Sequence, residues 1–191
     1  MNQADLTSDD MYYTKAEMKS MIQNYRKLGL DIIPEFDTPA HSLSFTKVRP
    51  DLRFGTTGRQ NDHFNLNTKY DESLAFVESI WDEYIKGDDP VFDRDTIVNI
   101  GTDEYDGQYT EQFRKFTDDL LAYIQDNGNT VRLWGSLTAR SGSTSVRSEG
   151  VQMNIWNDGW ANPKAMYQQG YDLIDMNDGC LLYTSDAADE L

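Results

Sequence analysis

Two adjacent carboxylates follow an apolar run near the middle of the chain, and such a pair could divide the work of acid–base catalysis. Residues 96–100 are typical of a buried strand, and Gly101 permits a tight exit from it before Asp103 and Glu104. Neighbouring side chains diverge, so the two carboxyl groups can serve different parts of a substrate. A nearly buried carboxyl group beside another tends to keep its proton, which suits a general acid. The alternative interpretation of the pair is a solvated helix cap.

Helical and strand-like segments alternate around this pair, an order typical of a parallel α/β sheet. The segment 14–28 begins with a capping box and carries apolar residues at helical spacing before Gly29. The other elements expected are helices over 71–86, 110–128 and 163–169, and strands over 30–36, 96–100, 130–134, 151–156 and 171–176. The interval 37–70 is expected to be irregular, and loops of that length are often functional lids.

Five strands in β-then-α order predict half or more of a (β/α)8 barrel. A doubly wound open sheet is the alternative, but no glycine-rich phosphate loop follows any expected strand. In a barrel, catalytic side chains lie where strands end and loops begin. Residues with suitable side chains occur at such places: Glu35, Asp37, Asp103, Glu104, Trp134 and residues 156–158.

The composition restricts the partners of this chain. Its 191 residues carry a net charge of −16, and 38% of them are hydrophobic. An acidic chain is a poor partner for nucleic acid or an anionic membrane surface, since both attract clustered Lys and Arg. The longest apolar run is the five residues 120–124, so no membrane span is expected, and residues 1–10 do not resemble a signal peptide. Neutral ligands, sugars among them, remain open.

Two segments carry a family resemblance. LGLDIIPEFDTPAHS at 28–42 and NIGTDEY at 99–105 resemble glycoside hydrolase family 20, the β-N-acetylhexosaminidase family that includes lacto-N-biosidases. The resemblance covers about residues 12–179 and implies a partial (β/α)8 TIM barrel, from the second helix through the seventh strand. It also implies retaining hydrolysis of terminal β-linked N-acetylhexosamine from glycans, in which the substrate's own acetamido group forms an oxazolinium intermediate.

The resemblance implies roles for individual residues. Glu104 matches the general acid/base of the family, and Asp103 matches the residue that orients and stabilises the 2-acetamido group. Asp37 and His41 match the PEFDTPGHS loop, in which the histidine helps to set the protonation of the acid/base residue. The family has glycine where this chain has Ala40. If that position requires a positive φ, alanine costs about 1 kcal/mol there.

Tryptophans provide the expected sugar-binding surface. Trp134 and Trp156 match the indoles that wall the N-acetylglucosamine pocket, and Trp160 is a further candidate on the following loop. Packing in the core is the alternative for each of them. Trp81 lies on the apolar stripe of an expected helix and is interpreted as core, whereas Glu35 is expected to supply a supporting hydrogen bond.

No metal ion or cofactor is expected. Two histidines, one cysteine and no HxxxH-type spacing disfavour a metal-dependent barrel hydrolase. The acidic stretch 88–95 lacks the glycine and glutamate spacing of a calcium loop. His63 is interpreted as exposed and uninvolved.

Two other functions within the family remain open. A lacto-N-biosidase would release a disaccharide, and Thr102, where hexosaminidases often carry glycine, favours that alternative slightly. A non-catalytic sugar-binding relative is disfavoured because both Asp103 and Glu104 are present. Secretion or display at the cell surface is expected for the full-length parent only by analogy.

The last residues are interpreted as foreign to the fold. Residues 180–190, CLLYTSDAADE, resemble the translation of a sequencing adapter, so we expect a catalytic segment over 1–179 and a non-native tail over 180–191. The family's tyrosine that assists Asp103 would lie near Tyr183, a match interpreted as coincidence. An incomplete barrel exposes strand edges. We therefore expect the chain alone to be poorly soluble and inactive, and its complete parent to be active.

Overall fold

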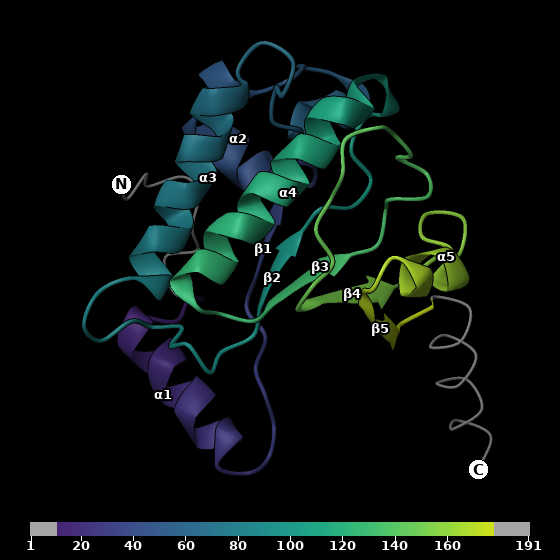
Figure 1. The fold of residues 1–191 in the computed structure, drawn as a ribbon. Coiled ribbons are helices and arrows are strands. Elements are labelled where there is room, and N and C mark those ends of the chain that lie inside the picture. Colours follow the sequence, from purple (N-terminus) through teal and green to yellow (C-terminus); the bar gives the residue numbers. More distant parts are fainter. Residues whose placement is uncertain (1–10, 178–191) are drawn as a thin grey trace, which may run out of the picture.

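The computed structural model describes residues 11–177, and the expected tail 180–191, with Tyr183, lies outside them. Its centre is a sheet of five parallel strands whose spatial order, β1-β2-β3-β4-β5, follows the chain (Figure 1). The strands are β1 (Glu35–Thr38), β2 (Val98–Gly101), β3 (Val131–Trp134), β4 (Val151–Ile155) and β5 (Asp172–Asp175). A parallel sheet in sequential order is the arrangement of a (β/α)8 barrel, and an open sheet with a reversal of strand order is excluded for these strands.

Five α-helices accompany the strands. They are α1 (Lys15–Arg26), α2 (Leu43–Val48), α3 (Tyr70–Ile85), α4 (Thr110–Asn127) and α5 (Pro163–Gln168), with 3-10 turns at Pro50–Leu52, Gly58–Asp62 and Gly107–Tyr109. Helices α3 and α4 lie side by side over the sheet, and α5 lies beside β5 (Figure 1). Each expected helix is therefore present, with its ends shifted by a residue or two.

The core lies between the sheet and the pair α3 and α4. Helix α4 places one apolar stripe against the strands, and these residues are buried: Phe113, Phe116, Leu120, Leu121 and Ile124. The strands contribute Val98, Ile100, Val131, Leu133, Val151 and Met153, all at most 1% exposed. Trp81 of α3 is 0% exposed, which confirms its interpretation as a core residue. Removal of this apolar surface from water is the main force that holds the sheet to its helices.

Helix α1 begins with the predicted capping box, and an ion pair connects its last residue to the segment before β2. The Thr14 side chain accepts from the backbone of Glu17, whose carboxylate accepts from the backbone of Thr14, so both halves of the capping box are present. At the other end, Arg26 makes two hydrogen bonds of 2.9 Å to the carboxylate of Asp93, just before β2. Helix α1 lies at the lower end of the molecule in Figure 1, where Lys15 pairs with Glu83 of α3 at 3.0 Å.

Two expectations about the first strand and the loop after it are wrong in part. The strand begins at Glu35 and not at residue 30, because Pro34 lacks an N–H and β1 is at the edge of the described sheet. The interval 37–70 is not irregular throughout: it contains α2 and two 3-10 turns, each too short to produce a helical period in the sequence.

The expected alternation of strands and helices is also wrong between β3 and β4. The connection 135–150 contains no helix, and side chains of α4 hold its backbone instead. Glu111 accepts from the backbone N–H groups of Ser143 and Thr144 at 2.7 and 2.8 Å, and Asp118 pairs with Arg147. These bonds give an extended segment the fixed course that a helix would otherwise provide.

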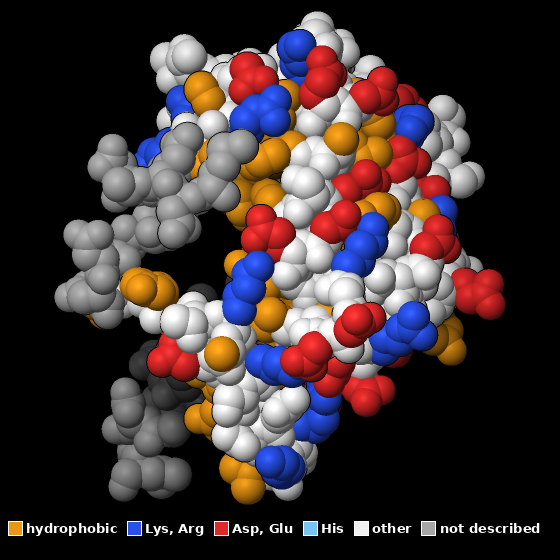
Figure 2. All heavy atoms as spheres, turned by 90° about the vertical axis from the view of Figure 1, so that its left-hand side faces the viewer, with side chains coloured by type: hydrophobic (Ala, Val, Ile, Leu, Met, Phe, Trp, Pro, Cys, Tyr) orange, Lys and Arg blue, Asp and Glu red, His pale blue; other side chains and the backbone are white. Residues whose placement is uncertain are grey.

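The surface is mixed in charge. On the side that faces the viewer in Figure 2, acidic and basic side chains alternate, with apolar side chains grouped between them. Among the described residues, no helix is long and apolar enough to cross a bilayer.

Candidate active site

The backbone is strained where the predicted catalytic residues lie. Among the described residues, His41, Thr102 and Glu104 are the non-glycine residues with a positive φ, at 52°, 70° and 46°. For residues other than glycine, a positive φ costs conformational free energy. Residues with such strained backbones gather at functional sites. All three directly follow β1 or β2, so the strain lies at the carboxyl edge of the sheet.

A glycine brings the exits of β1 and β2 into contact. Gly101 has φ +75°, and a Cβ atom there would lie 2.0 Å from Oδ1 of Asp37 and 2.6 Å from its Cα. No side chain fits that space. Gly101 therefore permits both the turn out of β2 and the approach of Asp37 to the loop that carries Asp103.

His41 lies between the two predicted catalytic carboxylates. Its Nε2 atom is 3.4 Å from Oε2 of Glu104 and 3.7 Å from Oδ2 of Asp103. Its Nδ1 atom is 3.8 Å from Oδ2 of Asp62, on the loop after β1. The imidazole can therefore interact with either carboxylate, and a protonated ring would offset part of their negative charge.

Burial raises the pKa of two carboxyl groups at this edge of the sheet, those of Asp37 in β1 and of Asp103 after β2. Burial, together with the negative charges of Asp103 and Glu35, raises the pKa of Asp37 to about 9. Burial also raises the pKa of Asp103, although His41 and a hydrogen bond from Asp37 act in the opposite direction. At neutral pH, Asp37 thus holds a proton that it can donate to the Asp103 carboxylate. The carboxyl group whose pKa is raised to about 9 is therefore that of Asp37, and proton retention by the Asp103–Glu104 pair, which the sequence predicted, stays a prediction.

Glu35 and Trp134 are joined directly. The Trp134 indole N–H donates to Oε2 of Glu35 at 3.0 Å, and the Asn99 side-chain amide donates to the same oxygen at 2.7 Å. Glu35 supplies the supporting hydrogen bond expected from the sequence, and it does so across the sheet from β1 to β3. Burial raises the pKa of Glu35, while the bond from Trp134 lowers it.

Trp156 lies at the end of β4 and stacks on a second tryptophan. The ring centroids of Trp156 and Trp160 are 5.6 Å apart, and the Trp156 indole N–H donates to the carbonyl of Gly135 at 2.9 Å. The guanidinium of Arg140 lies 4.6 Å from the Trp160 ring centroid. Trp134 ends β3 and Trp156 directly follows the neighbouring strand β4, and both side chains are partly exposed.

The interpretation of His63 as exposed is wrong. This side chain is 2% exposed, its Nδ1 lies 2.6 Å from Oδ1 of Asp62, and its ring stacks on Tyr105 at 5.0 Å. Burial lowers the pKa of His63, so the neutral ring is favoured. Asp62 therefore lies between two histidines, a role that no local sequence signal reveals. Tyr105 is packed between His63 and Phe113 and fixes the backbone that follows Glu104.

Ala40 carries no backbone penalty in this fold, because its φ is not positive. The positive φ belongs to the next residue, His41, while Ala40 is 0% exposed and outside the left-handed region. Ser42 supports the turn, because its hydroxyl donates to the carbonyls of Asp37 and Ala40 at 2.9 and 2.8 Å.

Asp37, His41 and Asp103 could also hold a cation. One ligand atom of each lies within 4.8 Å of the others, and two carboxylates with an imidazole suit several divalent metals. The raised pKa of Asp37 opposes this use at neutral pH, since a proton competes for that carboxyl group.

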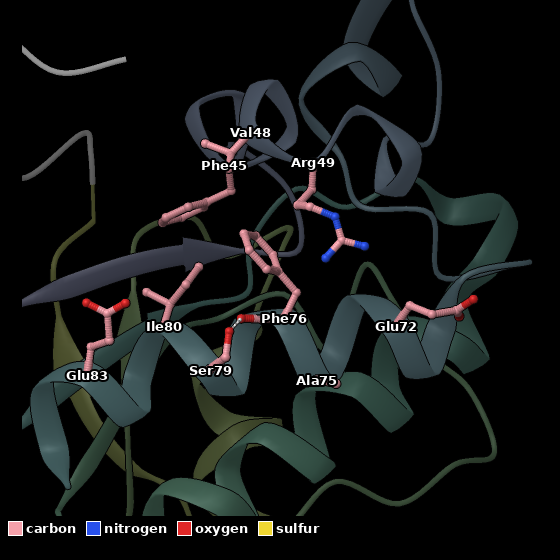
Figure 3. A pocket seen from close by; sticks show the side chains of 9 residues that line it. All are labelled: Phe45, Val48, Arg49, Glu72, Ala75, Phe76, Ser79, Ile80 and Glu83. Atoms are coloured by element: carbon pink, nitrogen blue, oxygen red, sulfur yellow. Dashed lines mark hydrogen bonds between the residues drawn. The ribbon is translucent and has the colours of Figure 1, made fainter. Parts of the chain in front are cut away.

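A groove of about 600 Å³ lies elsewhere, between α2 and α3 (Figure 3). Phe45 from α2 and Phe76 from α3 line it from opposite sides, and Arg49 lies over the ring of Phe76. None of the predicted site residues lines this groove. The chemistry-bearing side chains are therefore gathered at the carboxyl edge of the sheet and not in the groove.

The sequence is similar to a known enzyme family and to characterised members of it. The sequence model described as "Glycosyl hydrolase family 20, catalytic domain" matches residues 2–112, a range that includes Asp37, His41, Asp103 and Glu104. The chain is 24% identical to the lacto-N-biosidase of Bifidobacterium bifidum over 199 residues, which cover 93% of this chain and 17% of that protein. It is 31% identical to the human beta-hexosaminidase subunit beta over 113 residues, 56% of this chain and 19% of that subunit.

Solved structures share the fold. A catalytic module of the pneumococcal exo-β-D-N-acetylglucosaminidase StrH superposes with a TM-score of 0.73 at 19% identity, over 88% of this chain and 45% of that one. The Flavobacterium johnsoniae chitobiase superposes with a TM-score of 0.71 at 18% identity, over 91% and 30%. The chain thus spans less than half of each of these relatives, and its strands correspond to part of their fold.

Proposed function

Because this chain belongs to glycosyl hydrolase family 20, we propose that the protein of which it is part removes terminal β-linked N-acetylhexosamine from glycans, with retention of configuration. The observation that carries the proposal is the position of His41 within 3.4 Å of Glu104 and 3.7 Å of Asp103. His41 follows β1 and lies beside two acids that follow β2, which supports a division of labour between these acids.

In the first step, Glu104 donates its proton to the glycosidic oxygen as the bond from that oxygen to the anomeric carbon breaks. The carbonyl oxygen of the substrate's acetamido group attacks the anomeric carbon and gives an oxazolinium ion, so the protein need not supply a nucleophile. Asp103 accepts the amide N–H and stabilises the positive charge that develops on the ring.

In the second step, the carboxylate of Glu104 takes a proton from water as the water oxygen bonds to the anomeric carbon. The bond between that carbon and the acetamido oxygen breaks, which restores the acetamido group and the protonated acid. Two inversions give net retention. The proton on Asp37 supports this assignment, because a hydrogen bond from Asp37 would keep Asp103 charged and oriented.

Turnover of 4-nitrophenyl N-acetyl-β-D-glucosaminide by the complete enzyme tests the proposal. Glu104→Gln and Asp103→Asn should each lower kcat by about 10²–10⁴-fold, while Glu72→Gln, an exposed acid paired with Lys69, should leave it unchanged. A substrate with an N-trifluoroacetyl group should react more slowly, since its carbonyl oxygen is a weaker nucleophile. Equal rates for the two substrates would remove substrate assistance, and full activity of Glu104→Gln would remove the acid/base assignment.

The 191-residue chain alone is proposed to be inactive. Strands β1 and β5 are the two edges of the described sheet, and a barrel pocket needs walls on all sides. Turnover by the purified chain would contradict this part of the proposal.

Lacto-N-biosidase activity is the second candidate. The match to the Bifidobacterium bifidum enzyme covers 93% of this chain, which favours it. Release of a disaccharide from a glycan ending in galactosyl-N-acetylglucosamine would support this candidate, and release of a monosaccharide from a glycan ending in N-acetylglucosamine would support the first.

A further inference from the structure

We propose that Arg140 is a positioning residue that couples the backbone of the acid/base residue Glu104 to the tryptophan pair Trp156 and Trp160. The inference rests on the proposed function, because it gives Arg140 a role in the reaction assigned above. Arg140 itself contacts the backbone after Glu104 and an indole face, and acts on the substrate only through them.

The first half of the coupling is a hydrogen bond to the backbone. The Nε atom of Arg140 donates to the carbonyl oxygen of Tyr105 at 2.6 Å, one residue beyond Glu104. Glu104 has φ 46°, a conformation that persists only when neighbouring contacts hold it. The ring of Tyr105 is fixed by its hydroxyl, which donates to the carbonyl of Phe64 at 2.8 Å. Arg140 thus holds the carbonyl of the residue that directly follows the strained Glu104.

The second half is a cation on an aromatic face. The Arg140 guanidinium lies 4.6 Å from the centroid of the Trp160 ring, which in turn stacks on Trp156 at 5.6 Å. A guanidinium over an indole is the most favourable of the cation–π pairs, and stacking fixes the plane of both rings. The orientation of Trp156, a predicted wall of the sugar pocket, therefore depends on Trp160 and through it on Arg140.

The segment that carries Arg140 is hydrogen-bonded to α4 on one side and to the loop of Trp160 on the other. A shift of one of these loops should therefore shift the other. The carbonyl of Arg140 accepts from Nη1 of Arg114 in α4 at 2.9 Å, and Arg114 is 8% exposed. The backbone N–H groups of Thr138 and Ala139 both donate to the carbonyl of Trp160 at 3.0 Å. The loops after β2, β3 and β4 consequently meet at one side chain.

The contacts of Arg140 affect how Glu104 is placed relative to the substrate. Protonation of the glycosidic oxygen requires the carboxyl group of Glu104 to be placed correctly relative to the sugar that the indoles hold. A misplacement of about 1 Å can cost on the order of 100-fold in rate. Lysine cannot replace arginine fully here, because its ammonium lacks the flat face that stacks on an indole.

The test compares Arg140→Met and Arg140→Lys with the matched control Arg147→Met in the complete enzyme. Arg147 lies on the same connection, but its side chain pairs with Asp118 of α4. Near-ultraviolet circular dichroism reports on the stacked tryptophans, and steady-state kinetics reports on Glu104 and the sugar wall.

We expect Arg140→Met to lower kcat about 10–100-fold and to reduce the dichroism of the tryptophan pair. Arg140→Lys should recover part of kcat but not the dichroism, and Arg147→Met should remain within twofold of the wild type in both. Wild-type dichroism and kcat in Arg140→Met would overturn the proposal, as would an equal loss in Arg147→Met. If Arg140→Met does not fold, a wild-type result for Arg140→Lys in both measurements overturns it.

Failure of the proposed function gives a different result. In that case the wild-type enzyme does not turn over N-acetylhexosaminides, whereas the dichroism still reports whether Arg140 orders Trp156 and Trp160. Loss of the dichroism in Arg140→Met would then support the link from Arg140 to the tryptophans, and its retention would overturn the coupling.

Discussion

The Nε2 atom of His41 lies 3.4 Å from Oε2 of Glu104, although the two residues follow different strands. Gly101 makes this approach possible, because any side chain at that position would collide with Asp37 on the strand that leads to His41. The same Nε2 atom is 3.7 Å from Oδ2 of Asp103, so one imidazole lies close to both acids.

His41→Ala should move the acidic limb of the pH–rate profile upward by about one pH unit. Burial raises the pKa of Asp103 and the charge of His41 opposes that rise, so without His41 the anionic form of Asp103 requires a higher pH. The measurement is kcat/KM against pH from 4 to 9. An acidic limb at the wild-type position would show that His41 does not act on Asp103.

Asp37→Asn should flatten the dependence of stability on pH. In the folded protein the pKa of Asp37 is raised to about 9, whereas an unfolded aspartate titrates near 4. Between these values the folded state binds a proton that the unfolded state has released, so the free energy of unfolding falls as pH rises. Urea unfolding at pH 5, 7 and 9 should show this fall in the wild type and a smaller one in the variant.

Asp51→Asn provides the control for that measurement. Asp51 is an exposed carboxyl group paired with Arg49, and its pKa is lowered by that hydrogen bond. The decline in stability from pH 5 to 9 should persist in this variant. A decline of wild-type size in Asp37→Asn would mean that another group retains the proton.

Gly101→Ala should lower the free energy of unfolding by about 2–4 kcal/mol, from the left-handed backbone and the collision with Asp37 together. Gly29→Ala separates the two causes, because Gly29 has φ +79° but no atom within 4 Å of a Cβ there. That control should cost only about 1 kcal/mol. Equal losses measured by chemical denaturation would indicate that the contact with Asp37 relaxes at little cost.

Thr102→Gly should raise the free energy of unfolding by about 1 kcal/mol, since a β-branched residue at φ 70° is strained and its buried hydroxyl has no hydrogen-bond partner. Thr38→Gly is the matched variant: its hydroxyl is also buried without a partner, but its φ is negative. That substitution should lower stability. If both variants lose stability alike, the backbone of Thr102 is not strained.

The sequence predicted the helices whose apolar residues recur at helical spacing. It did not predict very short helices or contacts between residues far apart in the chain. Helix α4 was found because its apolar residues recur at helical spacing and Gly128 ends it. Helix α2 has six residues, too few to show a period. The burial of His63 against Tyr105 depends on a loop folding back over the sheet, which no local pattern encodes.

The candidate site was predictable to a similar degree. Asp103 and Glu104 are visible as adjacent acids after a buried strand, and the family resemblance located His41 and Trp134. The resemblance could not indicate which carboxyl group keeps its proton, since the raised pKa of Asp37 comes from burial and from neighbouring charges in three dimensions. Arg140 lies on a connection without a helix, and its contacts with Tyr105 and Trp160 follow from the course of that connection.

The connection 135–150 has no helix of its own, and side chains of α4 hold its backbone in place. Glu111, Arg114 and Asp118 of α4 all bond to the connection between β3 and β4. Loss of the contacts of Glu111 or Arg114 should therefore loosen the part of the connection that carries Arg140. Substitutions at Glu111 or Arg114 are therefore a route by which the loop beside Trp160 could shift while Asp103 and Glu104 stay the same.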